Sequence, residues 1–130
     1  MNHPIVALVI CLAIFVYVWL GINVARARGK YGVKAPAISG NADFERVFRA
    51  QQNMLEQLVI FIPALLVFAQ YLSPLWGAAI GAVWIVGRIW YALGYYAPQG
   101  RRGPGFVLSF GATMVLLIGA LTGIARAMLA

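Results

Sequence analysis

Four long apolar stretches follow one another along the chain, and short polar connections separate them. They run over residues 5–25, 43–71, 75–96 and 106–128. Each is long enough for a helix that crosses the hydrocarbon core of a bilayer, which takes about 20 apolar residues. No Lys or Arg precedes the first stretch, and it is long for a signal peptide, so we interpret it as a permanent span. The pattern predicts an all-α integral membrane four-helix bundle, forming one domain over residues 1–130.

The composition supports membrane insertion. Hydrophobic residues make up 63% of the 130 positions and charged residues only 10%, whereas soluble domains are about 45–50% apolar and about 25% charged. A small soluble protein has too much surface for its volume to hide this excess, and a disordered chain has few apolar residues. The net charge of +7 lies on an apolar chain, so we expect no nucleic-acid partner. Cys11 is the single cysteine, which excludes an internal disulfide, and we expect no metal site.

The basic residues are unevenly distributed among the connections. Four lie in the first connection (residues 26–42) and two in the third (residues 97–105), whereas the connection around Ser73 has none. Positive charge is concentrated in the cytoplasmic loops of membrane proteins. We therefore expect the first and third connections to be cytoplasmic and both termini to lie on the opposite side of the membrane.

Polar side chains interrupt the second and third stretches at helical spacing. On the second stretch a stripe about 80° wide contains Arg46, Arg49, Asn53 and Glu56. On the third stretch a similar stripe contains Arg88, Tyr91 and Tyr95. A charge near the bilayer centre costs on the order of 3 kcal/mol, so such residues pair or line a wet cavity. Either Glu56 and Arg88 form a buried ion pair, or the stripes line a polar pocket.

A pocket built from these stripes would carry excess positive charge. It would contain several arginines, one carboxylate, amides and two phenols. Arginine binds carboxylates through two parallel hydrogen bonds, and Glu56 can bind an ammonium group. These residues suit a small ligand with several carboxylates, one ammonium and peptide groups, and glutathione fits that description.

Two segments resemble the motifs of a known family. Residues 44–56 (FERVFRAQQNMLE) and 87–96 (GRIWYALGYY) are similar to those of the MAPEG superfamily, the membrane-associated proteins in eicosanoid and glutathione metabolism. The similarity extends over nearly the whole chain and is strongest to microsomal glutathione transferases and the cysteinyl-leukotriene synthase. It implies a left-handed four-helix bundle that assembles as a homotrimer. It also implies glutathione as co-substrate, bound between neighbouring subunits near the cytoplasmic face.

The same resemblance implies roles for individual residues. Glutathione-binding positions correspond to Arg28, Arg49, Gln51, Asn53, Glu56, Tyr91 and Tyr95. Arg102, seven residues past Tyr95, matches the arginine that stabilises the glutathione thiolate, and Arg49 is the alternative catalytic residue. Because Arg101 is adjacent, the sequence does not decide which of Arg101 and Arg102 is the matching arginine. Gln57 stands where the leukotriene enzyme has a tyrosine.

The resemblance therefore implies an enzyme, a membrane-bound glutathione transferase with peroxidase activity as a further possibility. Its second substrate would be a lipophilic electrophile that arrives from the bilayer among the membrane lipids. Two alternatives remain: a small proton-coupled transporter that uses Glu56, and a non-catalytic lipid-binding member of the same family. The arginines that share a stripe with Glu56 argue against the transporter. The sequence leaves open the electrophile, the balance of the two activities and whether the natural ligand is another thiol.

Overall fold

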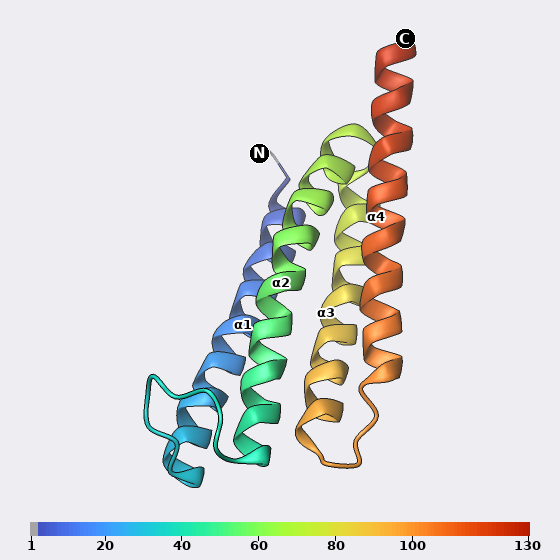
Figure 1. Cartoon of the computed structure of the whole chain (residues 1–130). Helices are drawn as coiled ribbons and strands as arrows, with labels where there is room; N and C mark the ends of the chain where they lie inside the picture. Colours follow the sequence, from blue (N-terminus) through green and yellow to red (C-terminus); the bar gives the residue numbers. More distant parts are fainter. Residues whose placement is uncertain (1–2) are drawn as a thin grey trace.

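The computed structural model describes residues 3–130, which form four helices that run alternately in opposite directions (Figure 1). Their bounds are α1 Pro4–Tyr31, α2 Ala42–Tyr71, α3 Pro74–Tyr96 and α4 Gly103–Leu129. All four are long and apolar enough to cross a membrane. The all-helical membrane architecture predicted from the sequence is therefore confirmed.

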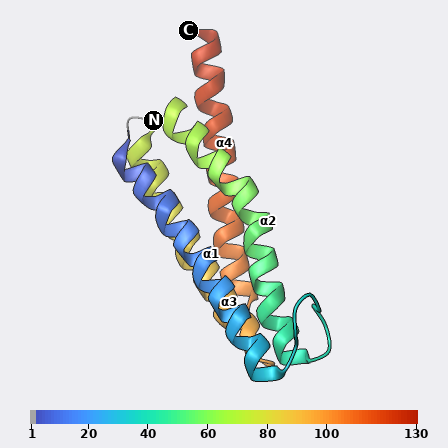
Figure 2. The same cartoon turned by 90° about the vertical axis from the view of Figure 1, so that its left-hand side faces the viewer.

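The central pair of helices is α2 and α3. They pack against each other, and each also packs against both α1 and α4, whereas α1 and α4 make no contact within residues 3–130. The outer two helices therefore lie on opposite sides of the central pair, and α4 extends past the other helices at the end that holds both termini (Figures 1 and 2). The bundle is consequently open between α1 and α4.

Two helices differ in length from the apolar stretches that predict them. Helix α1 continues six residues past position 25 and ends at a left-handed Gly32, with φ 69°, because the basic residues that follow the apolar stretch are good helix formers. Helix α4 begins three residues before position 106, with Pro104 in its first turn, where a missing N–H costs nothing. The connections are thus residues 32–41 and 97–102, shorter than the expected 26–42 and 97–105.

The core lies along the inner faces of α2 and α3. The rings of Phe61 and Trp84 stack with their centroids 3.8 Å apart, and Met54 and Leu116 are fully buried beside this layer. The outer faces are also apolar: Phe15 of α1 is 69% exposed and Val107 of α4 is 68% exposed. An apolar core inside an apolar surface is the arrangement expected of a protein whose solvent is lipid.

Glycines bring α3 and α4 into close contact near the 97–102 connection. A Cβ atom on Gly87 would lie 2.8 Å from the backbone nitrogen of Ser109, and one on Gly105 would lie 2.7 Å from the carbonyl oxygen of Gly87. Both distances are shorter than any real side chain tolerates, so only glycine permits this approach. The contact fixes the start of α4 against the tyrosine-bearing face of α3.

Candidate functional site

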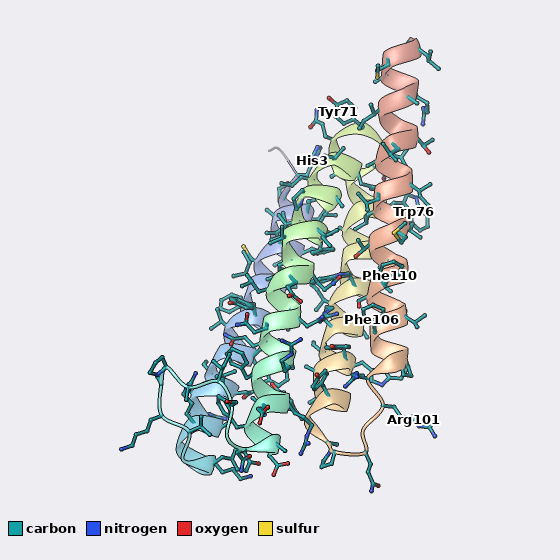
Figure 3. The ribbon with its side chains drawn as sticks, viewed as in Figure 1. His3, Tyr71, Trp76, Arg101, Phe106 and Phe110 are labelled. Carbon is teal, nitrogen blue, oxygen red and sulfur yellow. The ribbon has the colours of Figure 1, made fainter. Side chains whose placement is uncertain are left out.

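The polar side chains of α2 and α3 gather at the end of the bundle that carries the 32–41 and 97–102 connections. Figure 3 shows Arg101 at this end, whereas His3 and Tyr71 lie at the other. We call it the arginine-rich end, because the last turns of α1 with Arg28, the first turns of α2 with Arg46 and Arg49, and the connection with Arg101 and Arg102 all lie there.

Arg88 is a buried charge that joins three helices. One of its terminal nitrogens donates to Oδ1 of Asn53 on α2 at 2.5 Å, and the other donates to Oγ of Ser109 on α4 at 3.4 Å. Its guanidinium carbon lies 4.3 Å from the ring centroid of Tyr91. A cation that is hydrogen-bonded and stacked in this way is tolerated at membrane depth. Arg88 therefore connects the polar stripe of α3 to that of α2.

The expected ion pair between Glu56 and Arg88 is not formed. Glu56 is exposed on the outside of α2, and Arg88 bonds to Asn53 instead. Among residues 3–130 the one ion pair is between Asp43 and Arg46 in the first turns of α2. The polar stripes are therefore joined by a charge-assisted hydrogen bond, and the carboxylate of Glu56 remains available to a ligand.

A cluster of phenols and cations lies at the junction of α3 and α4. The ring centroid of Tyr91 is 5.6 Å from that of Tyr95 and 6.3 Å from that of Phe106. The guanidinium of Arg102 stacks over Tyr95 at 4.5 Å. On α2, Arg49 lies one turn before Asn53, on the same helical stripe, and Asn53 bonds to the Arg88 that stacks on Tyr91. Three helices thus contribute to one positively charged polar patch.

The two remaining predicted residues lie on the other side of α2. Arg28 donates through Nη1 to the carbonyl oxygens of Val33, at 3.3 Å, and Ala37, at 2.7 Å, and it stacks 4.9 Å from the Phe44 ring. It therefore holds the 32–41 connection against α2. The side chain of Gln51 faces α1, where its Nε2 would lie 3.3 Å from a Cβ on Gly21.

Within one chain the predicted residues thus form two separate groups. Asn53, Tyr91, Tyr95 and Arg102 lie on the α3–α4 side of α2, and Arg49 and Glu56 share the helical stripe of Asn53. Arg28 and Gln51 lie on the α1 side. Residues 51 and 53 differ by about 200° around the helix, so a single chain cannot direct both side chains at one ligand.

The sequence analysis did not identify two polar side chains that stabilise this arrangement, those of Ser109 and Asn23. Ser109 accepts the hydrogen bond from Arg88, and its hydroxyl also donates to the carbonyl oxygen of Phe106 at 3.2 Å. Asn23 of α1 donates to the hydroxyl of Tyr96 at the end of α3, at 3.0 Å. Asn23 is a lone polar residue inside an apolar stretch, and that isolation is the signal that could have identified it. Ser109 shares its stretch with Thr113, Thr122 and Arg126, so its sequence position gives no such signal.

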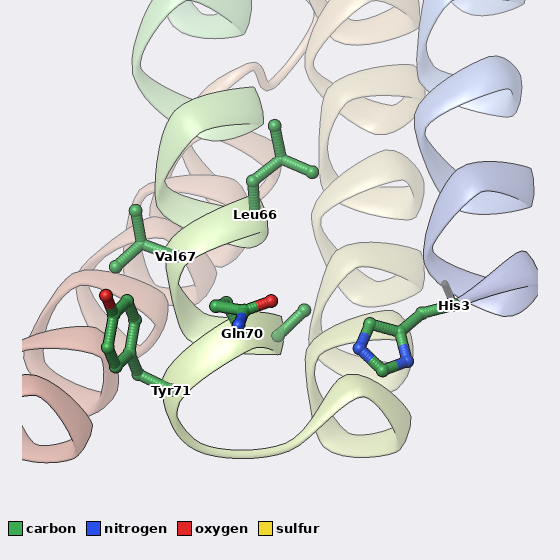
Figure 4. Close-up of a pocket in the computed structure, with 6 residues that line it drawn as sticks. His3, Leu66, Val67, Gln70 and Tyr71 are labelled. Carbon is green, nitrogen blue, oxygen red and sulfur yellow. The ribbon is translucent and has the colours of Figure 1, made fainter. Parts of the chain in front are cut away.

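A cavity of about 360 Å³ lies at the opposite end of the bundle, between α2 and the start of α1 (Figure 4). It is lined by His3, Leu66, Val67, Ala69, Gln70 and Tyr71. None of these described residues is a Lys or Arg, so the cavity is poorly suited to a ligand with several carboxylates. Residues 3–130 also contain no cluster of His, Cys, Asp and Glu that could hold a metal ion.

Comparisons with known proteins agree with the resemblance of the motifs. The model of the MAPEG family matches residues 6–122. Microsomal glutathione S-transferase 2 of Homo sapiens is 40% identical over 129 residues, which cover 98% of this chain and 87% of that protein. An uncharacterized protein of Synechocystis is 52% identical over 91% of this chain and 86% of its own length. Leukotriene C4 synthase of Cavia porcellus is 33% identical over 70% of this chain and 61% of its own length.

Proposed function

The chain belongs to the MAPEG family, and we propose that it is a membrane-bound glutathione transferase that also reduces lipophilic hydroperoxides. The transferase and the leukotriene C4 synthase among its relatives support glutathione-related transferase chemistry at the level of the family. The observation that carries the proposal for this chain is the patch around Tyr91, where Arg88 of α3 and Arg102 of the 97–102 connection stack on neighbouring tyrosines at the arginine-rich end.

The exposed stripe of α2 suits a tripeptide with charged ends. Arg49 and Glu56 are both exposed and lie seven residues apart on the same face of α2. This separation is about 10 Å along the helix axis, close to the span of about 10 Å of three extended residues. In our proposal Arg49 binds a carboxylate of glutathione and Glu56 binds its ammonium group. Asn53, between them, contacts the peptide groups.

We propose that the site is completed by a second copy of the chain in a homotrimer. Two charged residues on a lipid-facing surface would each cost on the order of 3 kcal/mol, so the face of Arg49 and Glu56 requires a polar cover. A neighbouring copy can supply Arg28 and Gln51, which lie on the other side of its own α2. Within residues 3–130, the hydrogen bonds of Arg28 use Nη1, so its other N–H groups can bind a carboxylate.

The proposed chemistry begins with ionisation of the glutathione thiol. A free thiol has a pKa of about 8.5 and is mostly protonated at neutral pH. The guanidinium of Arg102 favours the thiolate, and Arg49 or Arg101 are alternatives. The thiolate attacks an electrophilic carbon delivered from the bilayer and forms a carbon–sulfur bond while the bond from that carbon to its leaving group breaks. The leaving group departs with that electron pair, and the thiol proton leaves to water. With a hydroperoxide, two glutathione molecules give the disulfide, an alcohol and water. Tyr91 and Tyr95 would orient the sulfur with their hydroxyl groups.

We further propose that the arginine-rich end faces the cytoplasm and that both termini lie across the membrane. The concentration of basic residues at this end supports that orientation. Glutathione would then enter from the aqueous side, while the lipophilic substrate would enter laterally from the membrane.

Calorimetry of the detergent-purified protein with glutathione tests the proposal. We expect saturable binding, an increase in thiolate absorbance and transfer of glutathione to a lipophilic electrophile. Arg49→Gln should weaken binding, whereas Arg126→Gln, which removes a charge at the opposite end of α4, should not. Crosslinking should give a trimer. Proton-driven export without thiol transfer would instead identify a transporter, and lipid binding with neither activity would identify a non-catalytic member.

A further inference from the structure

An apolar groove runs along the outside of the bundle between α1 and α3, which pack against each other; α3 lies behind α1 in Figure 2. Its volume is about 420 Å³, and it is lined by Leu12, Phe15, Val16, Trp19, Ile85 and Ile89. None of these residues belongs to the proposed glutathione site. The groove is therefore a separate feature of the membrane-exposed surface.

The face of α1 that lines the groove continues into positive charge. Because α1 is one uninterrupted helix, positions on it can be compared at 100° per residue. Leu12, Trp19, Asn23, Arg26 and Lys30 fall within a stripe about 60° wide. The chain therefore presents one continuous strip on α1, apolar in the membrane and cationic at the arginine-rich end.

A polar bridge lies between the apolar and cationic parts of this strip. The amide of Asn23 donates to the hydroxyl of Tyr96 at 3.0 Å, which joins α1 to α3 at the end of the groove. Tyr96 lies on the same face of α3 as Ile85 and Ile89, within about 40°. The order along the groove is thus apolar side chains, then an amide and a phenol, then two cations.

The two cations at the end of the strip are available to a ligand. Arg26 and Lys30 are exposed, and the one ion pair within residues 3–130 involves neither of them. The ammonium of Lys30 lies 5.3 Å from the centroid of the Tyr31 ring on an exposed side chain, where an anion can reach it. By contrast, Arg28 bonds two backbone carbonyl oxygens of the next connection.

The dimensions fit one leaflet of a bilayer. Phe15 and Arg26 are separated by 11 residues, or about 16 Å along the helix, and half of the hydrocarbon core is about 15 Å thick. An acyl chain in the groove would therefore place its headgroup phosphate beside Arg26 and Lys30. The ester groups would lie at the depth of Asn23 and Tyr96.

We propose that this groove binds an anionic diacyl phospholipid from the leaflet at the arginine-rich end, with its phosphate held by Arg26 and Lys30. The strip lies about 160° around α1 from Arg28, so it faces away from the subunit contact that the proposed trimer requires. The lipid site does not depend on the proposed glutathione chemistry.

Native mass spectrometry of the delipidated full-length protein tests this site. The probes are phosphatidylglycerol and phosphatidylcholine with the same acyl chains. A cation near the membrane surface favours an anionic lipid about fivefold, so two cations predict a preference of about 30-fold. The double variant Arg26→Gln/Lys30→Gln should lose this preference. The control Lys34→Gln/Arg126→Gln removes the same charge away from the strip and should retain it.

A groove-filling variant provides an independent measurement. Val16→Trp should weaken the binding of both lipids while leaving their affinity ratio unchanged, and glycerol 3-phosphate without acyl chains should not compete. Equal affinity of the two lipids in the wild type would overturn the proposal. So would an equal loss of preference in both double variants, because the effect would then reflect net charge alone.

Discussion

Replacing Gly105 by Ala tests how α3 and α4 hold the arginine-rich end together. The added Cβ would overlap the backbone nitrogen of Tyr91 and would lie 2.8 Å from its Cα and 2.7 Å from the carbonyl oxygen of Gly87. These are backbone atoms, which cannot rotate away as a flexible side chain can. The two helices must therefore separate locally by up to about 1 Å to reach ordinary contact distance.

Two terms contribute to the expected loss of stability. Overpacking in a close contact costs about 1–3 kcal/mol, and the upper part of that range applies because only backbone atoms are met. The hydrogen bond from Arg88 to Ser109 is already 3.4 Å long, so separation should break it, at a further cost of about 1 kcal/mol. We therefore expect a loss of about 3–4 kcal/mol, equivalent to a decrease in melting temperature on the order of 10 °C.

Thermal unfolding in detergent, followed by circular dichroism, measures this effect. Gly111→Ala is the matched control on the same helix, since a Cβ there meets nothing within 4 Å, and it should leave the melting temperature unchanged or raise it. Gly105→Ala should also weaken glutathione binding, because Tyr91 moves with α3. Equal melting temperatures for the two variants would refute the inference that this glycine sets the contact between α3 and α4.

Three further predictions concern single side chains. Arg102→Leu should raise the thiol pKa of bound glutathione by about 1–3 units, measured by thiolate absorbance against pH, and Arg101→Leu should not; a larger effect of Arg101→Leu would reassign the role. Arg88→Leu should lower the free energy of unfolding by about 1–3 kcal/mol, because it leaves buried partners without a donor. Arg88→Lys should restore only part of the lost stability. Wild-type stability in Arg88→Lys would contradict a role for the guanidinium geometry. Asn23→Leu and Tyr96→Phe should each lower the free energy of unfolding by about 0.6 kcal/mol. The double variant should lose no more stability than either single variant. Additive losses in the double-mutant cycle would show that the two side chains are not coupled.

The hydrophobic pattern located the helices because crossing a bilayer imposes a minimum apolar length. The stretches 43–71 and 75–96 agree with α2 and α3 to within one residue at either end. The limits of α1 and α4 were less accurate, because hydropathy measures where lipid begins, whereas helix ends depend on hydrogen bonds and on Gly32 and Pro104. Polar residues next to a span can remain helical outside the hydrocarbon core.

The sequence by itself determined the four membrane helices and the direction in which each polar side chain leaves its own helix, because the helical period fixes that direction. Only the tertiary structure decided that Arg88 bonds to Asn53 while Glu56 stays exposed, and that Arg28 and Gln51 lie across α2 from Tyr91. The sequence of one helix fixes the direction of its own side chains, but it does not specify which side chains of a neighbouring helix they meet. The partner of each side chain depends on how closely the helices approach, and at Gly87 and Gly105 that approach depends on the missing side chains.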